Sequence, residues 1–306
     1  MKKNEFLQDP QTASFIEWLV SKIDGDEALA FAYQNGVDHD LGDSLARYEW
    51  PPKSVRVDTP NGVLSLAAQS SFAANSVVLE TLSAGMRTTL NAPTVNDEEL
   101  IHWARAIMKW GGVLTRKPNG KGNVGWLESM GATSFSEYLL RALAALNEHD
   151  DAAPRRLNDL RSNAGTTKVH SLLLPDFVIY DSRVAAALAW LVQSWGRAEA
   201  VEVPGHLRFA CMPANTTKQG GKLRSPDSTV FSNFSPSGDV RNHHRHATWN
   251  LRANWVIRSA IDRLQDRSEW SPRKVEAALF MMGDDLTWAA EVGGARRSTA
   301  SMPAMN

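Results

Sequence analysis

The sequence predicts a mainly α-helical protein that folds as one compact unit. Apolar residues recur at helical spacing in most segments, as they do at Leu100, Trp103, Ile107 and Trp110. No internal repeat and no alternation of strands with helices is visible along the 306 residues. A hydrophobic content of 43% is enough to form a sizeable core.

We expect two regions and a tail within this unit. Residues 1–133 are predicted to form an N-terminal helical region with an acidic start, because residues 1–50 carry ten acidic side chains against four basic ones. The second region spans residues 134–293. Residues 294–306 are expected to form a flexible tail, as chain ends often do.

The N-terminal region is predicted to hold three helical stretches, at residues 13–23, 27–34 and 64–90, and a short strand or connector at 55–63. The helix that follows has a clearer start signal in its sequence. Either Thr94 or Asn96 can cap this helix, and three acidic residues occupy its first turn, where they favour the helix dipole. Gly111 ends the helix.

The second region begins with a capping box, Ser134-x-x-Glu137, which predicts a helix directly after it. A short helix is then expected over residues 168–174. It stops before Pro175, because proline disfavours helical geometry in the residue that precedes it. Asp181 is expected to cap the next helix, which runs to about residue 194.

The C-terminal part of this region is basic and rich in loops. Residues 205–258 carry eight Lys and Arg side chains and only two Asp. Within them, residues 215–239 are rich in Gly, Ser, Pro and Thr and predict a long loop, and loops of this length are usually functional or mobile. Helices are expected from about residue 248 and from Ser271, which precedes a proline.

Composition limits the location and the general class of partner. A formal net charge of −1 argues against a whole-chain polyelectrolyte binder, while a local basic face stays open. One cysteine, Cys211, excludes an internal disulfide and fits a reducing cytoplasm. Neither a signal peptide nor an apolar run of membrane-spanning length is visible, so we expect a cytoplasmic protein without a membrane partner.

No cofactor or metal is expected. The motifs of phosphate-loop NTPases, Rossmann enzymes, elbow-type serine hydrolases and HExxH metalloproteases are all absent. The cluster His243-His244-x-His246 does not have a recognised zinc spacing, and no CxxC pair supports it. A basic surface is the simpler interpretation of these histidines.

The best candidate for chemistry is the pair Lys168 and Asp181. A lysine amine can act as a nucleophile when burial or cationic neighbours keep it neutral, and the apolar neighbours Val169, Leu172 and Leu173 favour burial. A nearby aspartate can stabilise a developing positive charge or accept a proton. From the pattern alone, a surface lysine and an ordinary N-cap stay open and are commoner.

Around this pair the sequence resembles the helix-hairpin-helix DNA glycosylases, and most closely their bacterial and archaeal 8-oxoguanine-glycosylase-like branch. The resemblance rests on two runs, Gly165-x-x-Lys168-x-x-Ser171-x-Leu173 and Val178-Ile179-Tyr180-Asp181-x-Arg183-Val184. It implies that Lys168 is the Schiff-base nucleophile and that Asp181 is the catalytic carboxylate. The segment from His246 to Trp255 also resembles bacterial members, and this hairpin carries one glycine where the family usually has two.

The resemblance implies a helix-hairpin-helix glycosylase-like helical bundle with a long basic loop, whose catalytic region is residues 134–293. Together with the basic section, it assigns DNA contacts to Gly165, Thr166, Thr167, Arg183, Lys218, Lys222, Arg224, Arg241, Arg245 and Arg252. It assigns the base pocket to Trp249, Trp255 and His246. The implied partner of this monomer is double-stranded DNA with a damaged or modified base.

The sequence therefore predicts a DNA N-glycosylase, with or without AP-lyase activity, that serves base-excision repair or antiviral defence against phage DNA. Other classes stay open. A non-catalytic helical DNA-binding protein would bind duplex in a salt-dependent way and leave no abasic product. A helical interaction module would have no DNA affinity at low salt, and a nuclease would depend on metal.

Overall fold

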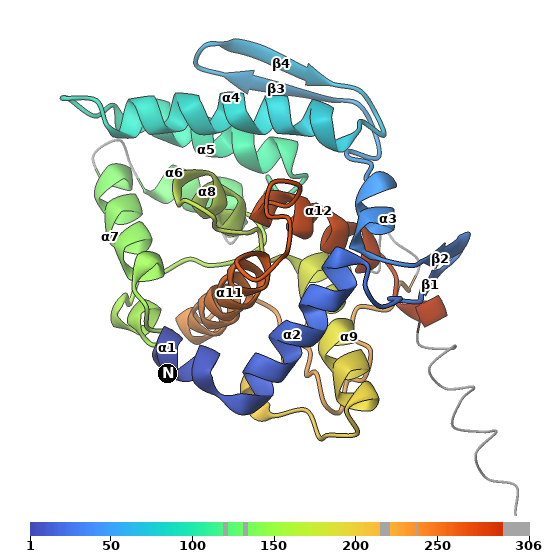
Figure 1. Cartoon of the computed structure of the whole chain (residues 1–306). Helices are drawn as coiled ribbons and strands as arrows, with labels where there is room; N and C mark the ends of the chain where they lie inside the picture. The colour runs from blue at the N-terminus through green and yellow to red at the C-terminus, as the bar shows by residue number, and fades with distance from the viewer. Residues whose placement is uncertain (119–121, 131–133, 215–220, 237, 290–306) are drawn as a thin grey trace, which may run out of the picture.

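The computed structural model describes residues 1–118, 122–130, 134–214, 221–236 and 238–289, and it confirms a mainly helical fold (Figure 1). In chain order the elements are α1 (Lys3–Gln8), α2 (Pro10–Asp24), β1 (Phe31–Tyr33), β2 (Gly36–Asp38), α3 (Leu41–Ala46), β3 (Val55–Thr59), β4 (Gly62–Leu66), α4 (Phe72–Leu90), α5 (Asp97–Trp110), α6 (Asn123–Ser129), α7 (Phe135–Asn147), η2 (Ala153–Arg156), α8 (Thr166–Leu173), α9 (Ser182–Ala198), η3 (Gly205–Leu207), α11 (Val240–Ile261) and α12 (Pro272–Met282). Here η marks a 3₁₀ helix.

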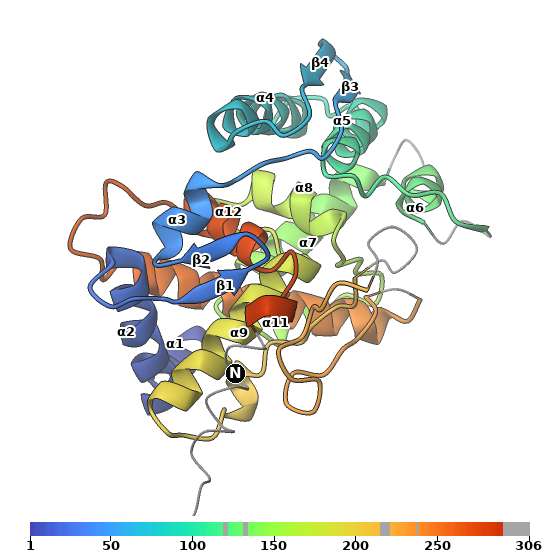
Figure 2. The ribbon, with the colours of Figure 1, turned by 90° about the vertical axis from the view of Figure 1, so that its right-hand side faces the viewer.

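Helix α9 runs through the core. Residues 184–192 are all buried, and four of them are alanines, which lets neighbouring helices approach closely. Helices α2 and α12 pack against α9. On the far side of α8, helices α4 and α5 separate α8 from the β3–β4 hairpin, as Figures 1 and 2 show. In the part of the chain that the structure describes, no helix is long and apolar enough to cross a membrane.

The helix expected over residues 27–34 is wrong, because this segment forms the antiparallel pair β1–β2, in which Phe31 faces Asp38. The phenyl ring of Phe31 is fully buried and meets the Trp190 ring edge-on at 4.9 Å between centroids. A tertiary contact on one face of a short strand has therefore overridden the local helical preference.

Other helix boundaries also differ from those predicted from the sequence. The helix α4 begins at Phe72 instead of residue 64, because Leu64 and Leu66 lie in β4. Of the two structures left open for residues 55–63, the strand is the one that forms, as β3 at Val55–Thr59. The helix α7 forms as expected, but Ser134 does not make the predicted cap bond, and its hydroxyl donates to the Met130 carbonyl instead. Asp239 caps α11, so this helix starts eight residues before residue 248.

Residues 177–181, which directly precede α9 and are called the extended segment below, are all buried, so their backbone polar groups need partners inside the protein. Most of these partners are polar side chains on one face of α11, His246, Asn250 and Asn254, which we call the polar stripe. The side chain of Asn254 accepts from the Val178 amide at 2.6 Å, and that of Asn250 donates to the Val178 carbonyl at 3.1 Å. One turn earlier, His246 Nε2 donates to the Tyr180 carbonyl at 2.8 Å.

Two further side chains complete this arrangement. The hydroxyl of Thr167, on α8, accepts from the Tyr180 amide at 3.0 Å and donates to Asn250 at 2.8 Å. The carboxylate of Glu276, on α12, accepts from the Ile179 amide at 2.5 Å. Three helices therefore hold the extended segment, and they determine where α9 begins.

We predict that Asn250→Ala destabilises the protein by about 1–3 kcal/mol, because it leaves the Val178 carbonyl buried without its donor and the Thr167 hydroxyl proton buried without its acceptor. The measurement is urea unfolding at neutral pH. Asn158 is exposed, and Asn158→Ala is the matched control that should unfold like the wild type. Equal midpoints for the two variants would show that the stripe does not stabilise the fold.

Two buried histidines make stability depend on pH. Burial lowers the pKa of His170 to about 4 and that of His246 to about 3. Histidine in an unfolded chain titrates near 6.5. Between about pH 4 and 6.5 the unfolded chain thus binds protons that the folded chain does not, and acidification favours unfolding.

We predict that His170→Leu flattens this dependence, because the variant lacks one of the groups that take up a proton on unfolding. Between about pH 6.5 and 4, its free energy of unfolding should fall less steeply than that of the wild type, by up to about 1.4 kcal/mol per pH unit. Urea unfolding at several pH values measures the slopes. Replacing the exposed His149 by leucine should leave the slope unchanged. Parallel lines for wild type and His170→Leu would contradict the prediction.

Candidate active site

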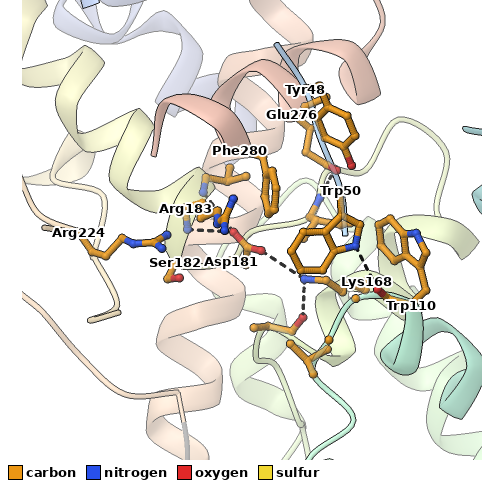
Figure 3. Close-up of a pocket in the computed structure, with 17 residues that line it drawn as sticks. Tyr48, Trp50, Trp110, Lys168, Asp181, Ser182, Arg183, Arg224, Glu276 and Phe280 are labelled. Atoms are coloured by element: carbon orange, nitrogen blue, oxygen red, sulfur yellow. Dashed lines mark hydrogen bonds and ion pairs between the residues drawn. The ribbon is translucent and has the colours of Figure 1, made fainter. Parts of the chain in front are cut away.

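A cavity of about 200 Å³ opens between α8, α9, α12 and the chain around Trp50 (Figure 3). Its lining combines aromatic and charged residues with small and aliphatic ones. The aromatic residues are Tyr48, Trp50, Trp110 and Phe280, and the charged residues are Lys168, Asp181, Arg183, Arg224 and Glu276. These residues come from distant parts of the chain.

Lys168 and Asp181 meet in this cavity. The ammonium Nζ of Lys168 lies 3.3 Å from Asp181 Oδ2 and donates to the Ala164 carbonyl at 3.1 Å. Both residues are buried, with exposed fractions of 4% and 8%. Lys168 belongs to the first turn of α8, and Asp181 is the N-cap of α9, so two helix starts bring the pair together.

The two oxygens of Asp181 have different partners. Oδ1 accepts from the backbone amides of Arg183 at 3.0 Å and Val184 at 3.2 Å, which orients the carboxylate, while Oδ2 faces Lys168. Burial by itself raises the pKa of this carboxyl. The charges of Lys168 and Arg183 and the two amides outweigh burial and hold the pKa below its ordinary value. Asp181 is therefore ionised at neutral pH.

Gly111 makes room for the lysine. A Cβ atom at this position would lie 2.3 Å from Cδ and 2.4 Å from Cε of Lys168. Any larger residue would therefore push the lysine side chain away from its present path. Gly111 directly follows α5, so the end of that helix helps to set the position of the amine.

The aromatic walls are fixed by hydrogen bonds behind the rings. Trp50 Nε1 donates to the Trp110 carbonyl at 3.1 Å, and Trp110 Nε1 donates to the Asn75 side chain at 3.0 Å. The Trp50 and Phe280 rings meet edge to face, 5.4 Å between centroids. Because their polar atoms are occupied, the two indoles offer the cavity mainly flat apolar surface.

Two acidic groups at the Phe280 end keep their protons more readily than usual. Burial raises the pKa of the Tyr48 hydroxyl, which makes no hydrogen bond within the described residues and lines the cavity. Burial also raises the pKa of Glu276, although Arg273 contacts both of its oxygens at 2.6 and 2.7 Å and opposes the shift. Tyr48 is thus a neutral donor that faces the cavity.

Arginines form the remaining wall. The guanidinium of Arg183 stacks on Phe280 at 4.2 Å and pairs with Asp284 at 2.8 Å. Arg224 and Lys222 also pair with Asp284. Close packing positions Arg183, because a Cβ at Gly283 would lie only 1.8 Å from the Arg183 carbonyl oxygen. Three of the predicted DNA contacts therefore share one carboxylate beside the cavity.

The turn at the start of α8, residues 163–167, is called the hairpin turn here. It was expected to contact a phosphate, but it does not face solvent. Gly165, Thr166 and Thr167 are all buried. The side chain of Asn163 accepts from the amides of Gly165 and Thr166 at 2.8 and 3.1 Å, and its carbonyl accepts from the Thr167 amide at 2.9 Å. These amides are satisfied within the protein, so the expectation that they bind a phosphate is corrected.

The residues assigned to the base pocket lie elsewhere, and that assignment is also corrected. His246 is buried between Tyr180 and the Ser162 hydroxyl. Trp249 packs near Phe209, and Trp255 packs near Phe6. None of the three lines the cavity. Tyr48, Trp50, Trp110 and Phe280 do, and their wide separation in sequence left no local signal of it.

The remaining predicted DNA contacts are also away from the cavity. Arg241, Arg245 and Arg252 line a separate hollow on the outside of α11. Lys218 lies outside the described residues. Among the residues that the structure does describe, no group of three or more histidine, cysteine or acidic side chains is placed to hold a metal ion. No family model, characterised protein or solved structure matches this chain.

We predict that Gly111→Ala displaces Lys168 from Asp181 while the protein stays folded, because the atoms in its way belong to a flexible side chain. Acetylation of Lys168 by acetic anhydride, followed by mass spectrometry, should become several-fold faster as the amine leaves its buried position. The control is Gly205→Ala, where an added Cβ meets no atom within 4 Å. Equal Lys168 labelling in both variants would contradict the prediction.

Proposed function

We propose that this protein is a DNA N-glycosylase that excises a damaged or modified base through Lys168 and Asp181. The observation that carries the proposal is the buried Lys168–Asp181 pair, 3.3 Å apart, at one end of a cavity with aromatic walls. The order of a lysine-bearing short helix, a buried extended segment and an aspartate-capped helix supports a helix-hairpin-helix glycosylase-like bundle. This proposal covers both repair of cellular DNA and defence against phage DNA.

The aromatic walls suit a base that has left the duplex. A glycosylase takes its target nucleotide out of the stack and holds the base between aromatic or apolar side chains. Trp50, Trp110 and Phe280 offer such surfaces, and the neutral Tyr48 hydroxyl offers a polar contact to an edge of the base. The positive side chains of Arg183 and Arg224 are placed to attract a phosphate that flanks the flipped nucleotide.

In the proposed reaction Lys168 first loses one ammonium proton to solvent, and the resulting neutral amine attacks C1′ as the bond from C1′ to the base breaks. The base leaves with the bonding electrons and takes up a proton, and Asp181 stabilises the positive charge that develops on the sugar. Loss of the amine proton and opening of the sugar ring give an imine between Lys168 and C1′. Elimination of the 3′ phosphate from this imine would nick the strand, which is the AP-lyase step.

A non-catalytic protein that grips duplex DNA through the hairpin has less support. Such a protein would need exposed backbone amides in the turn, and those of Gly165, Thr166 and Thr167 are occupied by Asn163. A catalytic role needs only that the hairpin positions Lys168. The helical interaction module has no observation in its favour at this cavity.

We predict that the wild type forms a covalent adduct with a duplex that carries one preformed abasic site when sodium borohydride is added. This substrate makes the test independent of the unknown base. Lys168→Gln should give no adduct, because it lacks the amine. Asp181→Asn still has an oxygen to cap α9 but lacks the charge, and it should form adduct about 10²- to 10⁴-fold more slowly.

Two matched variants control for general effects. Lys109 is an exposed lysine in the last turn of α5, and Asp40 caps α3 as Asp181 caps α9. Lys109→Gln and Asp40→Asn should both form adduct at the wild-type rate. Base release from modified DNA without any adduct would exclude the Schiff base, and base release that survives both Lys168→Gln and Asp181→Asn would exclude the proposed site.

A further inference from the structure

A second site is built on the outer face of α11. Here a hollow of about 430 Å³ is lined mainly by basic and aromatic side chains, which are Arg155, Arg241, His244, Arg245, Trp249 and Arg252. The α11 residues recur at helical spacing and share one face, and Arg155 reaches the hollow from η2. No acidic residue is among those that line the hollow.

The positive charge of this hollow is only partly neutralised. Asp239 pairs with Arg241, and Asp151 pairs with Arg252. The guanidinium of Arg245 donates to the Ser232 hydroxyl, which carries no charge. Arg155 is exposed, and its side chain makes no hydrogen bond or ion pair with the described residues. Two guanidinium groups are therefore left without a carboxylate.

One other polar group of the hollow offers a donor. His244 does not, because its Nε2–H is donated to the Leu157 carbonyl at 2.9 Å and Nδ1 of the neutral ring is an acceptor. The Trp249 indole N–H has no hydrogen-bond partner among the described residues. Arg252 lies over the Trp249 ring at 5.0 Å, and both residues line the hollow.

We infer that this hollow is a phosphate-binding site distinct from the catalytic cavity. Several planar guanidiniums converge on one concave site, and such forks match the oxygens of a phosphate. The two sites lie on opposite faces of α11, because His246 on the inner face contacts Tyr180, next to Asp181. The phosphate comes either from a DNA strand, in which case the inference rests on the proposed function, or from a free phosphate ester.

The test compares the wild type with the double variant Arg155→Gln/Arg245→Gln. Calorimetric titration with inorganic phosphate measures the site directly, and fluorescence anisotropy with an undamaged duplex at several salt concentrations measures DNA contact. The control is Arg263→Gln, since Arg263 lies beyond the other end of the 22-residue helix α11, roughly 30 Å away. Arg155→Gln alone serves if the double variant is unstable.

The double variant should bind phosphate about tenfold more weakly or worse. If the phosphate belongs to DNA, the slope of log Kd against log salt should also fall by about 1. Loss of phosphate binding with unchanged duplex binding would assign the site to a free phosphate ester. Wild-type values in both measurements would overturn the inference. Adduct formation at the abasic site depends on Lys168 and tests the proposed function. Phosphate titration tests this hollow, so failure of one proposal can be told from failure of the other.

Discussion

The requirement that buried backbone be hydrogen-bonded organises the middle of this protein. Among the described residues, no strand pairs with the extended segment before α9, so side chains satisfy its amides and carbonyls. His246, Asn250 and Asn254 do this from one face of α11, and Thr167 and Glu276 complete it. The same bonds determine where α9 begins, and thereby place the Asp181 carboxylate against the lysine of α8.

A buried ion pair is an uncertain source of stability, because both charges lose their hydration. In this protein the pair also imposes a steric constraint, since residue 111 must be a glycine for Lys168 to reach Asp181. Aromatic rings with occupied indole nitrogens surround it. A cavity that combines a constrained amine, an ionised carboxylate and flat apolar walls is well suited to chemistry on a planar ligand, and this combination favours the proposed glycosylase.

Helix α11 also divides the positive charge of the C-terminal region. Arg183 and Arg224 lie beside the cavity and share Asp284, whereas Arg241 and Arg245 line the outer hollow. One basic stretch of sequence therefore contributes to two sites with different surroundings. The hairpin turn contributes to neither as a phosphate contact, because its amides point to Asn163. Attraction of DNA would then rest on arginine side chains.

The sequence by itself determined those helices whose first residues carry a local start signal, such as an N-cap side chain. Asp181 and Ser271 cap α9 and α12 as predicted, because a cap needs only one side chain and the amides just after it. The pairing of Lys168 with Asp181 was also predicted. Only the tertiary structure decided the β1–β2 hairpin and the aromatic walls around Trp50, because packing between segments distant in sequence, which local periodicity does not encode, holds both.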